Sequence, residues 1–383
     1  MNVVAAYFLD NYYEHTAREG RNQHDLVPWL GQNTIFLARH GSHAYGTNTP
    51  TSDLDIKGVA VAPIAYHIGF LHQFEQANKG FKNDTCIFEV KKFLKLAAEC
   101  NPNIIELLFL DDRDILHLGR TFKPIRDNRD LFLSRVARHR FTGYAVAQLK
   151  RIETHRRWIL NPPKTEPTRR TFDLPDNTLL PKDQLLTAED LVCKKLESWE
   201  VDLEPVHPDT RIALQNRFEA VLSEMVVYDR YDLAGRALGM DSNMLEVMKR
   251  ERQYRQARAD WEKYRDWMKT RNPARHALEV QFGYDTKHGM HLVRLMRMCR
   301  EILETGKVLV RRPDAEELLA IRNGAWPYDK LIAWAKKEES EMGALAAHSP
   351  LPKQPPRERI DWLCQNVVSE FLGLNYGMVG HGG

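Results

Sequence analysis

The sequence has few cysteines, and they are spaced too far apart for a metal-binding or disulfide framework. It contains no CxxC pair and no His/Cys cluster at zinc-finger spacing. The five cysteines are Cys86, Cys100, Cys193, Cys299 and Cys364. An odd, dispersed set of this kind is typical of reduced thiols in a cytosol, so the sequence favours a cytoplasmic location.

Long apolar runs and an excess of one charge are also lacking. Nowhere do eighteen consecutive apolar residues occur, and the N-terminal stretch has no basic region followed by an apolar one, so we expect neither export nor a membrane span. Lysine and arginine total 55 against 52 acidic residues, a net charge of +3. This balance is too even to indicate nucleic-acid binding by itself.

What is present is ordinary globular material, 383 residues with 43% hydrophobic and 28% charged, which is enough for two or three domains. Apolar, β-rich segments at 33–38, 52–63 and 84–90 predict strands. A helix is expected over 91–99, ended by Asn101-Pro102, with Asn103 capping the next helix. Beyond about residue 115 helical patterns dominate, near 132–158, 210–238, 243–271 and 360–372, interrupted by a Pro-rich interval at 161–183 that predicts a long loop or insertion.

The most informative stretch is RHGSHAYGTNTPTSDLD, at 39–55. A turn at Gly41 and Ser42 leaves backbone N–H groups free to bind an anion, and glycine lets the backbone approach a phosphate closely. Asp53 and Asp55 are two residues apart and are expected on one face of a strand, where their carboxylates can bind magnesium. Two such ions about 3.5–4 Å apart can activate a hydroxyl and stabilise leaving pyrophosphate. The pattern therefore favours an NTP–metal site.

Strand, Gly-Ser turn, spacer and SDLD together resemble the DNA polymerase β nucleotidyltransferase superfamily. The longer pattern GSHAYGTNTPTSDLDIKGV, with KKFLKLAAECNPNIIELLF and YDTKHGMHLVRL, resembles its bacterial and phage branch of predicted nucleotidyltransferases, similar to the RNA-ligase-associated group. The resemblance implies an α+β fold, a small mixed sheet with helices followed by a mainly helical region. We accordingly predict a catalytic domain at 1–115, a helical accessory region at 116–282 and a helical C-terminal domain at 283–383.

The superfamily also places a third carboxylate on a neighbouring strand. Asp84 and Glu89, at the start and near the end of DTCIFEV, are the two candidates. The resemblance favours Asp84, because the family's acid is usually followed by an apolar strand run, as it is here by Cys86, Ile87 and Phe88. Glu89 stays open as an alternative, since it could equally be the first-turn acid of the next helix.

Basic residues near the motif are candidate phosphate contacts. Lys57 follows the aspartates on the same strand face. Lys287, His291 and Arg294 recur at i, i+4 and i+7 on one face of a predicted helix that Gly306 closes. The alternative is that His288 and His291 are ordinary partly buried histidines and that the arginines face solvent. Asn101 and Glu106 are expected to have structural roles.

The resulting hypothesis is an enzyme, of the nucleotidyltransferase class, that transfers NMP from an NTP to a hydroxyl. It would use two Mg²⁺ ions, for which Mn²⁺ can substitute, and RNA is the preferred acceptor because of the family association and the arginine-rich stretch Arg250 to Arg275. That stretch could equally be a solvated helix with i,i+4 ion pairs. Protein AMPylation in a toxin–antitoxin-like context and a non-catalytic nucleotide sensor are the alternatives.

Overall fold

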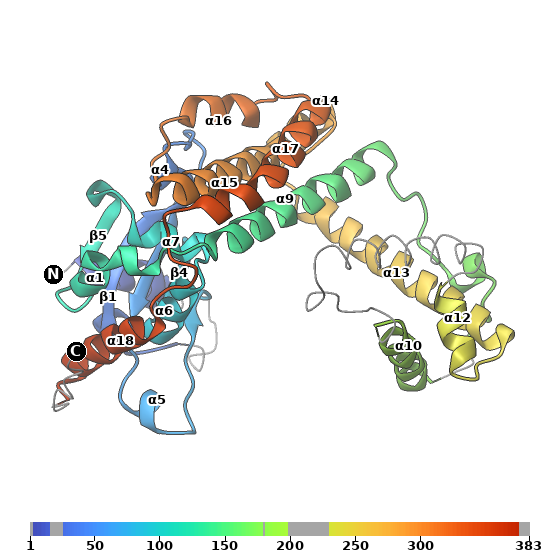
Figure 1. Ribbon diagram of the computed structural model, residues 1–383, viewed down its shortest axis with the longest axis horizontal. Coiled ribbons are helices and arrows are strands. Elements are labelled where there is room, and N and C mark those ends of the chain that lie inside the picture. The colour runs from blue at the N-terminus through green and yellow to red at the C-terminus, as the bar shows by residue number, and fades with distance from the viewer. Residues whose placement is uncertain (1–2, 16–25, 179–180, 198–229, 375–383) are drawn as a thin grey trace. The chain divides into compact units, whose positions relative to one another are not determined.

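The computed structural model describes residues 3–15, 26–178, 181–197 and 230–374 (Figure 1). The chain forms two compact units, one made of Met1–Leu160 with Pro273–Gly383 and the other of Asn161–Asn272. The domain boundaries predicted from the sequence, at 115 and 282, stay predictions, because compactness does not test which segments fold independently.

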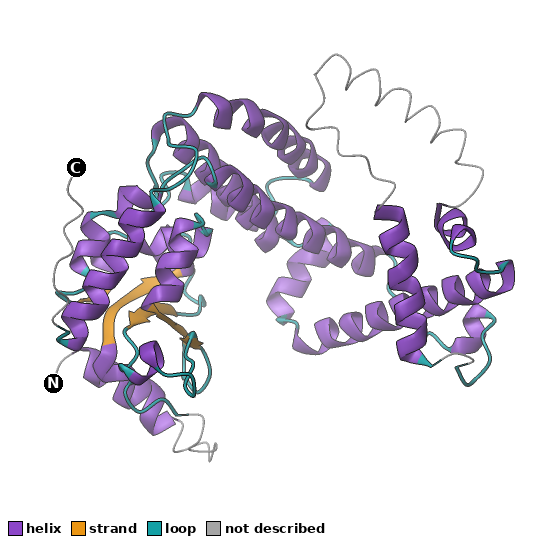
Figure 2. Ribbon diagram, turned by 60° about the horizontal axis from the view of Figure 1, so that its bottom comes forward, coloured by secondary structure: helices purple, strands orange, loops and turns teal. Residues whose placement is uncertain are grey.

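A five-stranded mixed sheet belongs to the first unit, in agreement with the predicted α+β class (Figure 2). The strands lie in the order β3-β4-β2-β1-β5, and among the described pairings β2 with β4 is parallel while the others are antiparallel. In chain order their bounds are Thr34–His40, Asp55–Ala60, Gln76–Ala77, Asp84–Glu89 and Ile115–Leu118. The three strands expected from the sequence are confirmed, although the second begins at Asp55 and not near Ser52.

The sheet is covered on both faces because its central strands are apolar on both sides. Phe36 and Val59 pack into the larger core with helices α6 and α7, whereas Leu37 and Ile56 pack into a smaller core with α1, η1 and α3. These covering elements are α6 (Val90–Ala98), α7 (Pro102–Leu108), α1 (Val3–Phe8), η1 (Leu9–Tyr13) and α3 (Leu30–Asn33). Alternation along each strand thus separates the two cores.

Helix α7 begins with an Asn-Pro signal, but its cap lies two residues earlier than expected. The Asn101 side chain accepts a hydrogen bond from the Asn103 backbone N–H at 3.1 Å, and Pro102 occupies the first helical turn. The prediction of Asn103 as the cap was therefore wrong. Asn101 provides the acceptor because it precedes the proline, which has no N–H of its own to satisfy.

Most of the rest of the first unit is helical. Its longest members are α9 (Ala137–Leu160), α15 (Thr286–Thr305) and α17 (Tyr328–His348), joined by α14 (Pro273–Phe282), α16 (Ala315–Arg322) and α18 (Arg357–Leu372). Shorter pieces are α4 (Gly41–Tyr45), α5 (Ala65–Ile68), η3 (Asp112–Asp114), α8 (Lys123–Asp127) and η4 (Arg129–Phe132). Helix α15 ends at Gly306, in the left-handed conformation at φ +67°, as the glycine predicted.

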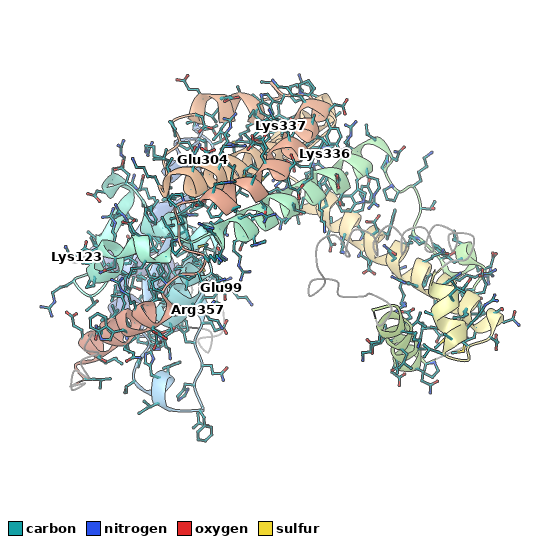
Figure 3. All side chains as sticks on the ribbon, viewed as in Figure 1. Glu99, Lys123, Glu304, Lys336, Lys337 and Arg357 are labelled. Atoms are coloured by element: carbon teal, nitrogen blue, oxygen red, sulfur yellow. The ribbon has the colours of Figure 1, made fainter. Side chains whose placement is uncertain are left out.

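Helix α15 is buried along most of its length because it packs against α9, α16 and α17. Charged side chains such as Glu304, Lys336 and Lys337 lie on the outside of this helical layer (Figure 3). None of the helices within the described ranges combines the length and hydrophobicity that a membrane span requires.

The second unit has a small core of its own. Leu185, Val192, Ala234, Leu245 and Met248 pack together from helices α10 (Lys182–Glu197), α12 (Arg230–Ala237) and α13 (Ser242–Thr270). The Pro-rich interval contributes one short 3₁₀ helix, η5 (Arg169–Phe172), in agreement with its irregular character. Of the helix expected at 210–238, residues 210–229 lie outside the described residues.

Candidate active site

The Gly-Ser turn follows directly from the end of strand β1. Gly41 has φ +63°, a left-handed conformation, and a Cβ added to it would lie 1.9 Å from Oδ2 of Asp55. Only glycine fits here without displacing that carboxylate. Gly41 and Ser42 are themselves the first two residues of α4, so the predicted turn is the start of a short helix. This helix ends at Gly46, with φ +75°, and the Thr47 N–H donates to the Ser42 carbonyl at 2.9 Å. The backbone at Gly41 is therefore in close contact with Asp55, one of the predicted metal ligands.

Two carboxylates meet at one edge of the sheet. Asp55 is the first residue of β2, and it pairs in parallel register with Asp84, the first residue of β4. On the other side Asp55 pairs with His40, the last residue of β1. Side chains at paired positions project from the same face of a sheet. The register therefore brings Asp55 and Asp84 together beside the Gly-Ser turn.

Asp53 is placed differently from its prediction. It precedes β2 and is exposed, so strand alternation orients Asp55 but not Asp53. The expectation that both aspartates lie on a strand is correct for Asp55 alone. Asp53 nevertheless lies near the site, because its charge, together with that of Asp55, acts on the Lys287 ammonium.

The electrostatics of Asp55 reflect this crowding. Burial raises the pKa of the Asp55 carboxyl, and the charge of Asp84 raises it further, while Lys57, His40 and Lys287 act in the opposite direction. Two like charges so close together repel each other, and Lys57, His40 and Lys287 offset this only in part, since the pKa of Asp55 stays raised. A divalent ion bound to both carboxylates would offset this repulsion further.

Glu89 lies at the opposite end of β4 from Asp84. Its carboxylate caps helix α6, accepting hydrogen bonds from the backbone N–H groups of Lys91 at 2.7 Å and Lys92 at 3.2 Å. It lies five positions beyond Asp84 along the strand, a distance of roughly 17 Å at the usual rise per residue. Of the two candidates for the third carboxylate, the structure brings Asp84 to Asp55 and engages Glu89 as a helix cap.

Two lysines approach the carboxylates. Lys57 shares the strand face of Asp55, and its Nζ lies 3.9 Å from Oδ1 of Asp84. Lys287 is half-buried on α15, and burial lowers the pKa of its ammonium, as do Arg275 and Arg322, whereas Asp55 and Asp53 raise it. Among the described residues Lys287 has no carboxylate within ion-pairing distance. Its charge is therefore held near the acids without being neutralised by one of them.

The remaining two predicted contacts on α15 are deeper. Burial, with Arg294 and His288 among the nearby charges, lowers the pKa of His291 well below its ordinary value, so its ring is neutral at pH 7. Arg294 is buried, forms an ion pair with Glu106, and stacks its guanidinium 3.8 Å from the centroid of the Tyr45 ring. The structure therefore gives Arg294 an internal partner, and its role as a nucleotide contact stays a prediction.

Arg294 belongs to a buried polar network that lies under the turn. The Tyr45 hydroxyl donates to Oε2 of Glu106 at 2.5 Å, and Nε2 of His40 lies 3.1 Å from the same oxygen. Burial would raise the pKa of Glu106, but the charge of Arg294 together with His40 and Tyr45 holds it at about 2. The structural role expected for Glu106 agrees with these contacts. Its partners were missed, because nothing in the local sequence relates 106 to 294.

A separate cluster has the composition of a metal site but not its electrostatics. Within the described part of the chain, His155, Asp285 and His288 are the one group of three whose ligand atoms lie within 4.8 Å of one another. The Asp285 carboxylate already accepts hydrogen bonds from the Arg275 guanidinium at 2.6 Å and, as the cap of α15, from the His288 backbone N–H at 3.1 Å. A guanidinium thus occupies the position where a cation would bind. We regard the cluster as a junction between α9, α14 and α15.

Asp53, Asp55 and Asp84 do not form so close a group. Mg²⁺ prefers oxygen ligands, keeps several waters and completes its shell with substrate phosphates, so it needs only one or two carboxylates from the protein. The acidic residues at this edge of the sheet therefore fit a hard divalent cation, and the imidazole-rich cluster does not replace them.

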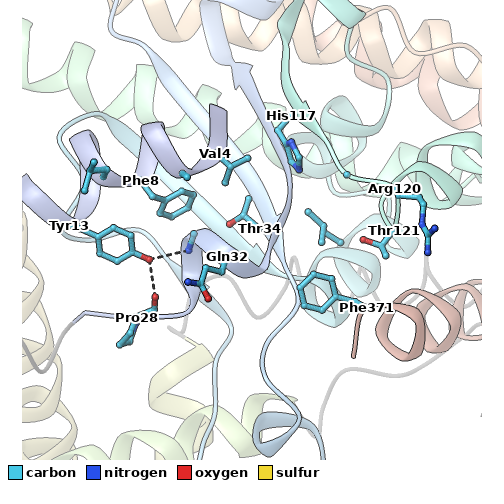
Figure 4. A pocket seen from close by; sticks show the side chains of 15 residues that line it. Val4, Phe8, Tyr13, Pro28, Gln32, Thr34, His117, Arg120, Thr121 and Phe371 are labelled. Atoms are coloured by element: carbon cyan, nitrogen blue, oxygen red, sulfur yellow. Dashed lines mark hydrogen bonds between the residues drawn. The ribbon is translucent and has the colours of Figure 1, made fainter. Parts of the chain in front are cut away.

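A cavity of about 760 Å³ lies elsewhere in the first unit (Figure 4). Its lining comes from α1, the segment around Gly31, the start of β1, the residues after β5 and Phe371 of α18. In this cavity the Tyr13 hydroxyl donates to the Pro28 carbonyl at 3.0 Å and accepts from the Gly31 N–H at 3.2 Å. None of the predicted site residues lines it, since the Gly-Ser turn is at the other end of β1.

The part of the chain that is similar to known proteins contains Gly41, Ser42, Asp53, Asp55 and Asp84. Residues 15–162, less than half of the chain, match the family described as "RNA repair pathway DNA polymerase beta family". An uncharacterized 38.9 kDa protein from the nrdC–mobD intergenic region of Enterobacteria phage T4 is 32% identical over 111 residues, which make up 26% of this chain and 33% of that protein. The chain thus spans about a third of that relative. No solved structure matches.

Proposed function

We propose, on the premise that residues 15–162 match the RNA repair pathway DNA polymerase beta family, that the protein is a metal-dependent nucleotidyltransferase. The match confirms the superfamily resemblance predicted from the Gly-Ser and SDLD motif. The observation that supports the proposal most directly is the register of β2 and β4, which sets Asp55 beside Asp84 next to Gly41. The reaction is the transfer of NMP from an NTP to a hydroxyl acceptor.

In the proposed reaction an acceptor oxygen forms a bond to the α-phosphorus while the bond from that phosphorus to the bridging oxygen breaks and pyrophosphate leaves. Asp53, Asp55 and Asp84 would hold magnesium, with manganese as a substitute, and two such ions supply Lewis-acid stabilisation of the attacking and leaving oxygens. Asp84, the more exposed carboxylate of the paired two, would orient the acceptor and receive its proton.

The backbone of Gly41 and Ser42 and the ammonium groups of Lys57 and Lys287 would bind the phosphates. Lys287 is half-buried without an acidic partner in the described residues, so it can neutralise an incoming polyphosphate. Because the phosphates and the carboxylates share these two lysines, binding of the NTP and of the metal should be coupled.

RNA is the proposed acceptor, and this choice rests on the family description, which names RNA repair. The arginine-rich helix α13 gives it little support. Arg250 pairs with Glu246 and Arg258 with Glu262 along the helix, and Arg255 pairs with Glu189. These contacts match the alternative of a solvated helix with i,i+4 pairs.

The proposal is tested by incubating the protein with magnesium and each of four α-labelled NTPs, with and without total RNA, and following the label and the release of pyrophosphate. Label in RNA identifies an RNA nucleotidyltransferase and its base, whereas label on protein identifies a protein-modifying enzyme. NTP binding without any transfer would support the nucleotide sensor and contradict the proposed reaction.

The acidic residues give the first prediction. Asp53→Asn, Asp55→Asn and Asp84→Asn should each lower kcat by about 100-fold or more, because each removes a charge that binds the metal. Asp127→Asn is the matched control, since Asp127 is an exposed acid whose ion pair, among the described residues, is with Lys123 on the same helix. Normal turnover in Asp55→Asn would contradict the assignment.

A further inference from the structure

The C-terminal end of helix α4 is held by residues more than 260 positions further along the chain. The Arg312 backbone N–H donates to the Tyr45 carbonyl at 3.0 Å, and Nη2 of Arg311 donates to the His43 carbonyl at 3.2 Å. The last carbonyls of a helix have no partner within it, so they need donors from elsewhere. Here both donors come from the segment that follows α15.

Gly46 lets this segment approach. A Cβ at Gly46 would lie 3.2 Å from Nη1 of Arg311 and 3.8 Å from the Ala315 side chain, and its φ of +75° also favours glycine. A side chain at Gly46 would therefore press on the guanidinium that covers it. The Arg311 side chain, 38% exposed, additionally lies 3.4 Å from Oδ2 of buried Asp114.

The segment itself is rigidly attached to α15. Arg312 is 4% exposed, and its guanidinium donates two parallel hydrogen bonds to Glu301, at 2.6 and 2.7 Å, and a third to Asp314 at 2.8 Å. Asp314 also accepts from Arg297 at 2.6 Å. Bidentate arginine–carboxylate pairs fix geometry as well as charge. The backbone at 312 is thus a fixed donor for α4.

A second attachment of α4 to α15 is the stacking of Arg294 on Tyr45, with Glu106 bound to both. Helix α4 is therefore gripped at its side by α15 and at its C-terminal end by residues 311 and 312. All of these C-terminal contacts come from outside residues 15–162, the segment that matches the polymerase β family.

We infer that Arg311 is a positioning residue for the nucleotide site, fastening α4 so that the Gly-Ser turn keeps its place against Asp55. The inference rests on the proposed function. Helix α4 has five residues and is too short to be stable alone, so its orientation depends on such contacts. The matched segment is in this sense an incomplete site, which the segment after α15 completes.

The test compares Arg311→Ala and Arg311→Lys with the wild-type full chain. Arg311→Ala should speed hydrogen–deuterium exchange in residues 41–47 and lower kcat/KM for the NTP by about tenfold, the value of one lost charge-assisted hydrogen bond. Arg311→Lys should restore part of both, because an ammonium can also donate to the His43 carbonyl. A role confined to overall stability would lower the unfolding temperature without this local exchange or the rescue by lysine.

Two controls isolate the contact with α4. Asp114→Asn removes the ion pair of Arg311 but keeps its hydrogen bond to His43, and should leave exchange in 41–47 unchanged. Arg120→Ala breaks an equally long-range contact, to Glu370 at 2.9 Å, beyond the far end of β5, and should also change neither quantity.

Unchanged exchange in Arg311→Ala would overturn the inference, and so would faster exchange with an unaltered kcat/KM. If the wild-type protein turned over no NTP on any acceptor, the proposed function would fail. Exchange in residues 41–47 would then still decide whether Arg311 fastens the turn.

Discussion

At the scale of single residues, the site depends on one glycine. Gly41 carries two constraints at once, a left-handed backbone and an Asp55 carboxylate oxygen that would lie 1.9 Å from any Cβ at this position. Strain alone would be tolerated, since a left-handed residue costs about 1–2 kcal/mol. The collision is the greater problem, because a methyl group would occupy the position of the carboxylate oxygen itself.

Gly41→Ala should therefore lower kcat/KM by about 100-fold or more, as expected when a reactive group is displaced by about 1 Å. Gly373→Ala is the matched control, because Gly373 has φ +66° with no atom within 4 Å of the added methyl. Thermal melts would show the cost of the left-handed backbone in both variants, with a further loss in Gly41→Ala, and activity assays would show the defect in Gly41→Ala alone. Equal activity in the two would refute the role of the close approach.

At the scale of elements, the buried ion pair between Glu106 and Arg294 joins α7 to α15 beneath the turn. Breaking one partner of a buried pair leaves an uncompensated charge and typically costs about 3–5 kcal/mol. Replacing both partners removes that charge. The pair therefore determines the relative placement of the two helices more than it adds net stability.

Glu106→Gln should lower the free energy of unfolding by about 3–5 kcal/mol, and the double variant Glu106→Gln, Arg294→Met should lose less, measured by chemical denaturation. The pKa of Glu106 is about 2 in the folded chain, below its ordinary 4.5, so its contribution is present above pH 4.5 and is lost as the pH falls toward 2. The wild type should lose stability over this window more steeply than Glu106→Gln. Parallel pH profiles would argue against the pair.

The same scale explains why Glu89 and Asp84 are different. Both are acids on β4, but they lie at opposite ends of this six-residue strand, too far apart to share one site. The end that enters α6 uses its carboxylate to satisfy free N–H groups. The end that starts beside β2 leaves its carboxylate for a cation.

At the scale of the whole molecule, ligand binding should stabilise the first unit, which contains all the predicted site residues. With the Mg²⁺–NTP complex at 100 times its dissociation constant, binding should raise the free energy of unfolding by about 2.7 kcal/mol. The unfolding temperature should rise with both ligands together, and the rise should vanish with EDTA or in Asp55→Asn. A rise of equal size in Asp55→Asn would show that the ligand binds elsewhere.

The second unit has its own small core, so a thermal scan can contain two transitions. Only the transition that belongs to the first unit should shift with ligand. Assigning the transitions by hydrogen exchange on α13 and α15 would make the comparison direct.

The sequence by itself determined the local parts of this protein. The Gly-Ser turn, the strands that flank it, the spacing of Asp53 and Asp55, and the end of α15 at Gly306 all follow from turn chemistry and apolar alternation, which act over a few residues. The family resemblance favoured Asp84 over Glu89, although it could not exclude the latter. The local signals misplaced one helix cap and assigned Asp53 to a strand.

Only the tertiary structure decided which distant residues meet the turn. Lys287 lies near Asp55, Glu106 pairs with Arg294, and Arg311 donates to the His43 carbonyl. These contacts join positions that are about 190 to 270 residues apart. Such contacts have no local signature, because a buried arginine and a solvated one look alike in sequence. Their partners are fixed by how α15 packs against the sheet domain, and that packing is a property of the whole first unit.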